Sequence, residues 1–442
     1  MASGESPPVL ETLPSEIRLD ILCILPYDSS QALIMASPVY FKTALEYRDL
    51  IRRQNGAASV EAFTLEAEAV YCARRMRLSE AYTQDGPDSD PGYYTESYPP
   101  MHASSHYTME TISRFAVSYM RDRKSNRKVL SFASHTGEQR RQMVDFHMST
   151  IMPIARRFTQ SALKNFAGQP EAQSSFVHEP ITTTEEYRIV RAVYRFELCC
   201  QLFDDRAPDL EVVARNKHGI DLATMLQLLH TMFHPWEVEE ILCINGFLEI
   251  KYNDIFDVAT WDFDRNKPKF GYAPNMSCTD PLSRLSRHSY HRDYYLCGTL
   301  TRGLGLLQRA LSAMEQNHDQ QLVEIIKNEM RIEPIGFLGT YSGAVTEICK
   351  NALRARRGLS EQDLKRERRD PFPFRGDIIP DPNAEFPPLA WTIIWKDTYS
   401  NVVGDAIPYR MRYWGYVMWD AERITKAGGK EILQRQSRGI RG

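Results

Sequence analysis

The sequence predicts an all-α protein in which a small N-terminal three-helix module is followed by an irregular multi-helix domain with long loops. Apolar residues recur at helical spacing along most of the chain, whereas the alternating runs typical of strands are scarce. Pro, Gly, Ser and Asp gather in several stretches without a period, which predicts long loops. Because the chain has 442 residues, we expect more than one hydrophobic core.

Composition narrows the class of protein. Hydrophobic residues make up 43% and charged residues 25% of the chain, as is usual for a globular protein. The net charge of −3 gives no electrostatic argument for binding nucleic acid or an anionic membrane. The sequence shows no secretory signal and no apolar run long enough to span a membrane, and no two of its eight cysteines have the common zinc spacing. We therefore expect a protein of the cytoplasm or nucleus, without cofactor or metal.

The first helical stripe lies close to the N-terminus. Its apolar side chains, which recur at the spacing of one helix face, are Leu13, Ile17, Ile21, Leu22 and Leu25. Pro14 suits a helix start, where its missing N–H costs nothing. Shorter apolar pieces follow, punctuated by Pro26 and Pro38. Each piece is too short to bury its apolar face alone, so we expect three short helices within residues 13–55 that need the rest of the chain or a partner.

The stretch 13–40 resembles an F-box, the adaptor-binding module of Skp/cullin/F-box ubiquitin ligases. The matching positions are Leu13-Pro14, Glu16-Ile17, Ile21-Leu22, Leu25-Pro26, Leu33, Ala36, Ser37 and Tyr40. The second helix departs from the family pattern, because Ser29-Ser30-Gln31 replaces an acidic residue and two leucines, and Pro38 replaces a basic residue. The resemblance implies docking on a Skp-type adaptor, and through it a cullin, by Leu13, Pro14, Ile17, Ile21, Leu22, Leu25 and Pro26. The other interpretation is an amphipathic helical hairpin packed on its own domain.

Four regions follow along the chain. We expect the N-terminal module at 8–55, a linking helix at 56–82, a disordered loop at 83–108 and a helical body at 109–442. Ser59 is the expected N-cap of a helix over 59–78. The loop at 83–108 differs from the linking helix before it, because it carries Gly, Pro, Ser and Asp without a helical period.

The helical body divides into segments of helical pattern. We expect one helix at 38–55 in the module, and helices of the body at 109–134, 138–167, 182–204, 219–233, 236–260, 289–316, 318–331 and 341–355, with loops at 265–287 and 370–388. Pro153 should kink or split its helix, and Thr183 to Glu186 have the spacing of a capping box. Pro235 fits either a turn or the first position of the next helix. Large aromatic side chains over 391–423 predict that this segment packs into the body.

Three phrases of the body, at 191–197, 236–241 and 415–420, resemble segments of a large fungal family of F-box-like proteins. That resemblance implies architecture and no substrate.

Several clusters of residues could bind a metal, a cofactor or a ligand, but for each of them we favour a purely structural role. His230 and His234 with Glu237, and His288 and His291 with Asp293, have the look of metal ligands, but Pro235 breaks the first group and capping explains the second. Gly303 and Gly305 lack the third glycine and the preceding strand of a dinucleotide site. The basic runs at 121–128 and 354–369 suit solvated helix faces or an acidic partner. Trp236 with its following glutamates suits either a ligand groove or a buried helix start.

These observations favour a substrate-receptor-like subunit over an enzyme, since no nucleophile–base pair or metal pattern stands out. The module would dock the adaptor, and the helical body would hold an unknown protein target. The alternative is a stand-alone helical interaction or scaffold protein, whose F-box-like segment does not engage an adaptor.

Overall fold

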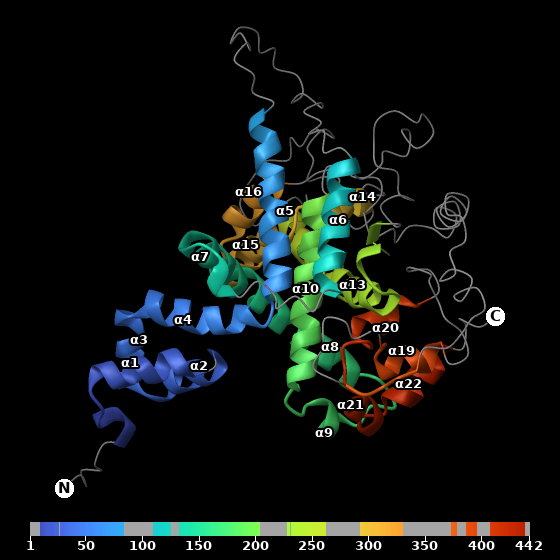
Figure 1. The fold of residues 1–442 in the computed structure, drawn as a ribbon. Helices are drawn as coiled ribbons and strands as arrows, with labels where there is room; N and C mark the ends of the chain where they lie inside the picture. The colour runs from blue at the N-terminus through green and yellow to red at the C-terminus, as the bar shows by residue number, and fades with distance from the viewer. Residues whose placement is uncertain are drawn as a thin grey trace.

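The computed structural model describes residues 9–25, 27–83, 109–124, 132–203, 228–229, 231–261, 292–329, 373–377, 386–395 and 407–437. Every regular element within these ranges is a helix (Figure 1), which confirms the all-α prediction. The expected disordered loop at 83–108, apart from Thr83, lies outside the described residues, as do the loop at 265–287, the helix at 341–355 and most of the loop at 370–388.

The N-terminal module is a set of short helices. They are η1 (Val9–Thr12), α1 (Ser15–Ile24), α2 (Tyr27–Ala36), α3 (Pro38–Glu46) and α4 (Arg48–Glu61). The helix predicted at 38–55 is broken at Tyr47, so three short helices are followed by a fourth that runs past residue 55. The Ser37 side chain caps α3 by accepting the N–H of Tyr40, with Pro38 at the first helical position. Figure 1 shows these helices to one side of the body, with α4 leading across to it.

The helix predicted from Ser59 begins later than expected. This helix, α5, spans Thr64–Thr83, and Ser59 lies inside α4 instead of at a helix start. Its hydroxyl oxygen is 2.8 Å from Nε2 of His147, so it makes a long-range hydrogen bond where a capping bond was expected. The chain turns at Ala62 and Phe63.

The helix predicted at 138–167 is continuous and carries a π-helical turn just before Pro153, where a kink or split was expected. The parts are α7 (Gly137–Phe146), the π-helical turn η3 (His147–Ile151) and α8 (Met152–Ala167). A proline has no N–H, so residue 153 cannot donate to the carbonyl of Ser149. Just before it, the N–H of Met152 donates to the carbonyl of His147, five residues back, as in a π-helix.

The main hydrophobic core is built around α10 (Thr183–Phe203). This helix packs against α5 and against α13 (Pro235–Trp261), and it runs through the middle of the body in Figure 1. The helix predicted at 182–204 is confirmed, and Pro235 is the first residue of α13. The capping box is formed by Thr182 and Glu185, one residue earlier than the pair that the sequence predicts.

The remaining described helices surround this pair. They are α6 (Met109–Lys124), η2 (Phe132–Ser134), α9 (Ser174–Val177), α14 (Arg292–Leu300), α15 (Leu304–Glu315), α16 (Asp319–Glu329), α19 (Leu389–Ile394), α20 (Tyr409–Tyr413), α21 (Ala421–Lys426) and α22 (Gly429–Gln436). The helix predicted at 289–316 is interrupted at Gly303, whose φ of 86° favours glycine. A Cβ there would lie 2.8 Å from the carboxylate of Glu197, which accepts the N–H of Leu304. The glycine therefore makes room for a buried helix cap, which leaves no place there for a dinucleotide phosphate.

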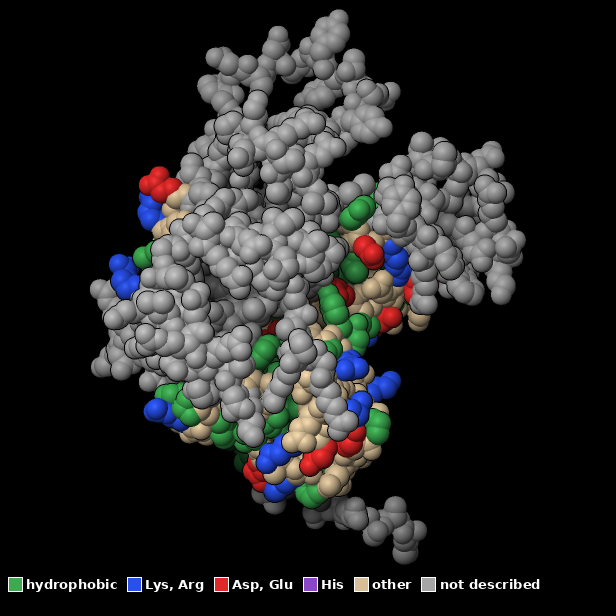
Figure 2. Space-filling model, turned by 90° about the vertical axis from the view of Figure 1, so that its right-hand side faces the viewer, with side chains coloured by type: hydrophobic (Ala, Val, Ile, Leu, Met, Phe, Trp, Pro, Cys, Tyr) green, Lys and Arg blue, Asp and Glu red, His purple; other side chains and the backbone are tan. Residues whose placement is uncertain are grey.

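The C-terminal aromatic residues belong to the main core, as the sequence predicts for 391–423. Trp414 and Trp419 have no exposed surface, and Trp391 is 2% exposed. The indole N–H of Trp419 donates to the carbonyl of Trp414 at 2.7 Å, and that of Trp414 donates to the side chain of Gln436 at 3.1 Å. On the outside, around α19 to α22, acidic and basic side chains lie side by side among small apolar areas (Figure 2).

Candidate functional site

The N-terminal module has a small core of its own. One side chain comes from each of its four α-helices: Leu22, Ile34, Tyr40 and Ile51. Leu22 and Tyr40 have no exposed surface, and this cluster is separate from the main core of the body. The side-chain amide of Asn55 on α4 donates to the carbonyl of Leu22 at 3.0 Å. The module is therefore held together internally, and its outer surface is free to serve another purpose.

Large apolar side chains are exposed on that outer surface. They are Leu10, Ile17, Ile24, Met35, Phe41, Leu45 and Leu50, and the most exposed are Ile24 at 82% and Met35 at 81%. Ile17 and Ile24 are seven residues apart on α1, and Phe41 and Leu45 are four apart on α3, so each pair lies on one side of its helix. In the rest of the described chain only Val117, Tyr409 and Tyr413 are comparable, which makes the module the apolar part of the surface. We use the name apolar face for these seven side chains taken together, which come from η1, α1, α2, α3 and α4.

Six of the docking residues implied by the F-box resemblance are described, and they divide into three groups by their exposure. Pro14 is exposed and precedes the first residue of α1, and Ile17 is 46% exposed on that helix. Leu13, Ile21 and Leu25 are half-buried. Leu22 is fully buried in the module's core, so its side chain is not available to a partner, contrary to the role that the resemblance implies. Pro26 lies outside the described residues.

Ile24, Met35, Phe41 and Leu45 were not among the predicted site residues, although the sequence carries a signal for two of them. Ile24 continues the stripe of Ile17 and Ile21 at helical spacing, and Leu45 follows Phe41 by one turn. Met35 has no such signal, because its exposure depends on how α2 packs.

The electrostatics of the module's first helix are simple. Glu16 lies in the first turn of α1, where a negative charge complements the helix dipole. A backbone hydrogen bond and a bond from the Ser15 hydroxyl lower the pKa of Glu16, so it is ionised at neutral pH. Burial raises the pKa of the Cys23 thiol, which argues against a reactive cysteine beside the apolar face.

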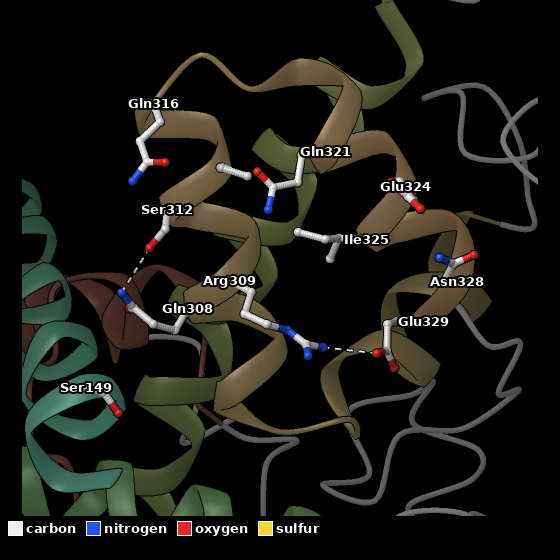
Figure 3. A pocket seen from close by; sticks show the side chains of 11 residues that line it. Ser149, Gln308, Arg309, Ser312, Gln316, Gln321, Glu324, Ile325, Asn328 and Glu329 are labelled. Carbon is white, nitrogen blue, oxygen red and sulfur yellow. Dashed lines mark hydrogen bonds and ion pairs between the residues drawn. The ribbon is translucent and has the colours of Figure 1, made fainter. Parts of the chain in front are cut away.

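A second candidate site is a polar groove in the body, between α15 and α16 (Figure 3). Its volume is about 620 Å³. Exposed amide groups of Gln316, Gln321 and Asn328 stand along it, and an ion pair from Arg309 to Glu329, with N and O 3.0 Å apart, closes one end. Amides both donate and accept hydrogen bonds, and Glu324 and Ile325 add a carboxylate and an apolar side chain, so the groove suits a chain of mixed character such as a polypeptide.

The glutamates after Trp236 are engaged in the interior and line no groove. Trp236 is 3% exposed, as expected for a buried tryptophan at a helix start. Glu237 accepts hydrogen bonds from Arg123 at 2.7 Å and from Arg195 at 2.8 Å, all three side chains being buried. Burial alone would raise the pKa of Glu237, but the two guanidinium groups outweigh it and hold the pKa well below its usual range. Glu239 likewise pairs with Arg412 at 2.7 Å.

The sequence gives little warning of this buried ionic network. Arg123, which we assigned to a basic surface run, faces the interior and also donates to the carbonyl of Met232. Arg191 and Arg195 occupy the same helix as the apolar stripe of α10 and pair with glutamates of α13. Only their partners in space explain why these charges are buried, and a sequence pattern does not reveal them.

The remaining clusters hold no site within the described chain. No group of three metal-binding side chains comes together there, and His234 instead donates its backbone N–H to Glu237 at 2.9 Å and stacks on Trp236. The candidates His230, His288 and His291 lie outside the described residues, as does the basic run at 354–369. None of the described helices is long and apolar enough to cross a membrane.

Comparison with protein-family models, with curated proteins and with solved structures finds no match to this chain.

Proposed function

We propose that this chain is a substrate-receptor-like subunit of a Skp/cullin/F-box type ubiquitin ligase. The module would bind the adaptor through the apolar face, and the helical body would hold a protein target. One observation carries the proposal: a module that closes its own core around Leu22 and Tyr40 still exposes Ile24 and Met35 almost completely. Exposed apolar side chains that gather on one small module are typical of a docking surface.

Such a subunit performs no bond chemistry of its own. It raises the effective concentration of a target's lysine near a ubiquitin-loaded enzyme by holding both in one complex. For the target, the polar groove between α15 and α16 is the surface in the body whose chemistry fits a polypeptide.

The departures from the F-box pattern set the expected strength of docking. Ser29 is exposed and Ser30 is buried on α2, at positions where the family pattern has an acidic and an apolar residue. Because Ser30 and Gln31 stand where the family pattern has two leucines, apolar contacts are lost, and the affinity for adaptor should be lower than that of a full-consensus F-box.

The proposal is tested by binding of a purified Skp-type adaptor to the full-length chain and to an Ile17→Asp/Ile24→Asp double variant. Burying one such side chain contributes about 1.5–3 kcal/mol, so the loss of both should weaken binding at least about 100-fold. Since both residues are exposed, the thermal midpoint should not change. Ala58→Asp, which adds a charge at an exposed position of α4 outside the F-box-like stretch, is the matched control and should bind like the wild type.

Leu22→Asp should differ from the double variant in its effect on stability. It places an unpaired charge in the module's core, so it should abolish binding and also unfold the module. A wild-type chain that does not bind adaptor at tens of micromolar, or a double variant that binds unchanged, would refute the receptor proposal and favour the stand-alone scaffold.

A further inference from the structure

Helix α4 belongs to both parts of the molecule. Ile51 on α4 lies in the core of the module, and Asn55 donates to the carbonyl of Leu22 on α1. Further along α4, Val60 has no exposed surface and belongs to the main core of the body. The same helix therefore anchors both cores, with Gly56 and Ser59 between the two anchors.

The body receives α4 at the junction of α7 and the π-helical turn η3. We call Val144, His147 and Met148 the α4 seat. A Cβ on Gly56 would lie 2.5 Å from Cγ1 of Val144 and 2.9 Å from Cγ of Met148, so the two helices touch where the glycine leaves room. Val144 is buried and β-branched, so it has little freedom to move aside.

His147 completes the seat with a buried chain of hydrogen bonds. Its Nε2 is 2.8 Å from the Ser59 hydroxyl, and its Nδ1 is 2.9 Å from the hydroxyl of Tyr194 on α10. The ring has no exposed surface. The extra residue of the π-helical turn places His147 in line with both partners, and Pro153 is the sequence feature that accompanies this turn.

We infer that the α4 seat fixes the direction in which the module's apolar face points relative to the body, with Ser59 and His147 as positioning residues. Held in this seat, α4 can neither slide nor rotate freely relative to the body. The side chains at the contact interlock, and a hydrogen-bonded ring resists both sliding and rotation of α4 about its axis. If the module docks an adaptor as proposed, the seat also determines where the groove between α15 and α16 lies relative to that adaptor. Only this last consequence rests on the proposed function.

The test measures the distance between the module and the body in the full chain, without adaptor. Spin labels carried by noncanonical amino acids replace Gln31 on α2 and Gln316 after α15, both exposed, so the native cysteines stay. We expect one narrow distance distribution in the labelled wild type. Ser59→Ala should broaden it at least twofold, whereas Ser59→Thr, which keeps the hydroxyl, should restore the narrow form.

Gly56→Val should shift the mean distance by several ångströms, since the new side chain pushes α4 off Val144. Ala58→Val, at an exposed position on the same helix, is the control and should leave the distribution unchanged. If Gly56→Val does not fold, as judged by its thermal midpoint, the Ser59 pair decides alone. A broad distribution in the wild type, or Ser59→Ala that matches the wild type, would overturn the inference. Failure of the receptor proposal would appear only in adaptor binding and leave these distances unaffected.

Discussion

The N-terminal module and the helical body bury their helices in different ways. Four apolar side chains, one from each α-helix, close the module's core, whereas the body surrounds α10 on several sides and adds buried ion pairs such as Arg195 with Glu237. Most of the described exposed large apolar side chains accordingly lie in the module. Within the described residues, the body covers most of its large apolar side chains itself, whereas the module leaves several of them at its surface.

The largest expected effect tests the completeness of the body's core. Trp419→Ala removes a side chain with no exposed surface, so we expect the free energy of unfolding to fall by about 3–5 kcal/mol. Chemical denaturation followed by tryptophan fluorescence measures this. Hydrogen exchange in α1 to α3 should stay at the wild-type rate, because their core is separate. If the module's amides lose protection together with the body's, the two cores are one cooperative unit and the comparison fails.

An effect of intermediate size is expected in how the stability of the body, but not that of the module, depends on pH. Burial lowers the pKa of His147 from 6.5 to about 3, so between these values the unfolded chain binds a proton that the folded chain does not. His147 should therefore contribute a loss of about 1.4 kcal/mol of body stability for each pH unit below 6.5. The variant His147→Gln should lose this part of the slope, as measured by urea unfolding between pH 6 and pH 4.

The module serves as the internal control for that experiment. Residues 8–55 contain no histidine, so exchange protection in α1 to α3 should not follow the same slope. A slope in His147→Gln equal to that of the wild type would show that His147 is not the group responsible.

The smallest effect compares helix caps in the two parts. Ser37→Ala removes the cap of α3 and the bond that the Ser37 hydroxyl donates to Glu11 at 2.5 Å, while Thr136→Ala removes the capping box of α7. Each should cost about 1 kcal/mol. Local hydrogen exchange should locate the first loss in the module and the second in the body. Equal effects of both variants on the same amides would argue against separate stability.

Sequence reasoning succeeded where a local rule was enough. The period of α10, the irregular turn before Pro153 and the burial of the C-terminal tryptophans all follow from spacing, from a missing N–H or from side-chain size. It failed where a side chain's role depends on a distant partner. Ser59 looks like a cap but bonds His147, and Arg123 looks like surface charge but pairs with Glu237.

The candidate site shows the same limit. An apolar stripe predicts that α1 has an inner face, but it does not tell which apolar residues remain outside once the other helices have packed. Leu22 and Ile24 are two positions apart, and one is fully buried while the other is 82% exposed. The apolar spacing therefore located the helix, and the packing of α2 to α4 decides which of its apolar side chains remain exposed.

The start of α10 also bears on how the protein is made. Glu185 caps this helix in the middle of the chain, yet its carboxylate also accepts hydrogen bonds from Arg423 at 2.8 Å and from the backbone N–H of Asp420 at 3.0 Å. During synthesis, which proceeds at roughly 5–20 residues per second, these partners are made more than 230 residues after Glu185. For that interval the first turn of the central helix has only its local capping bonds with Thr182. The body can therefore complete its fold only after Arg423 has been synthesised, long after the residues of the module.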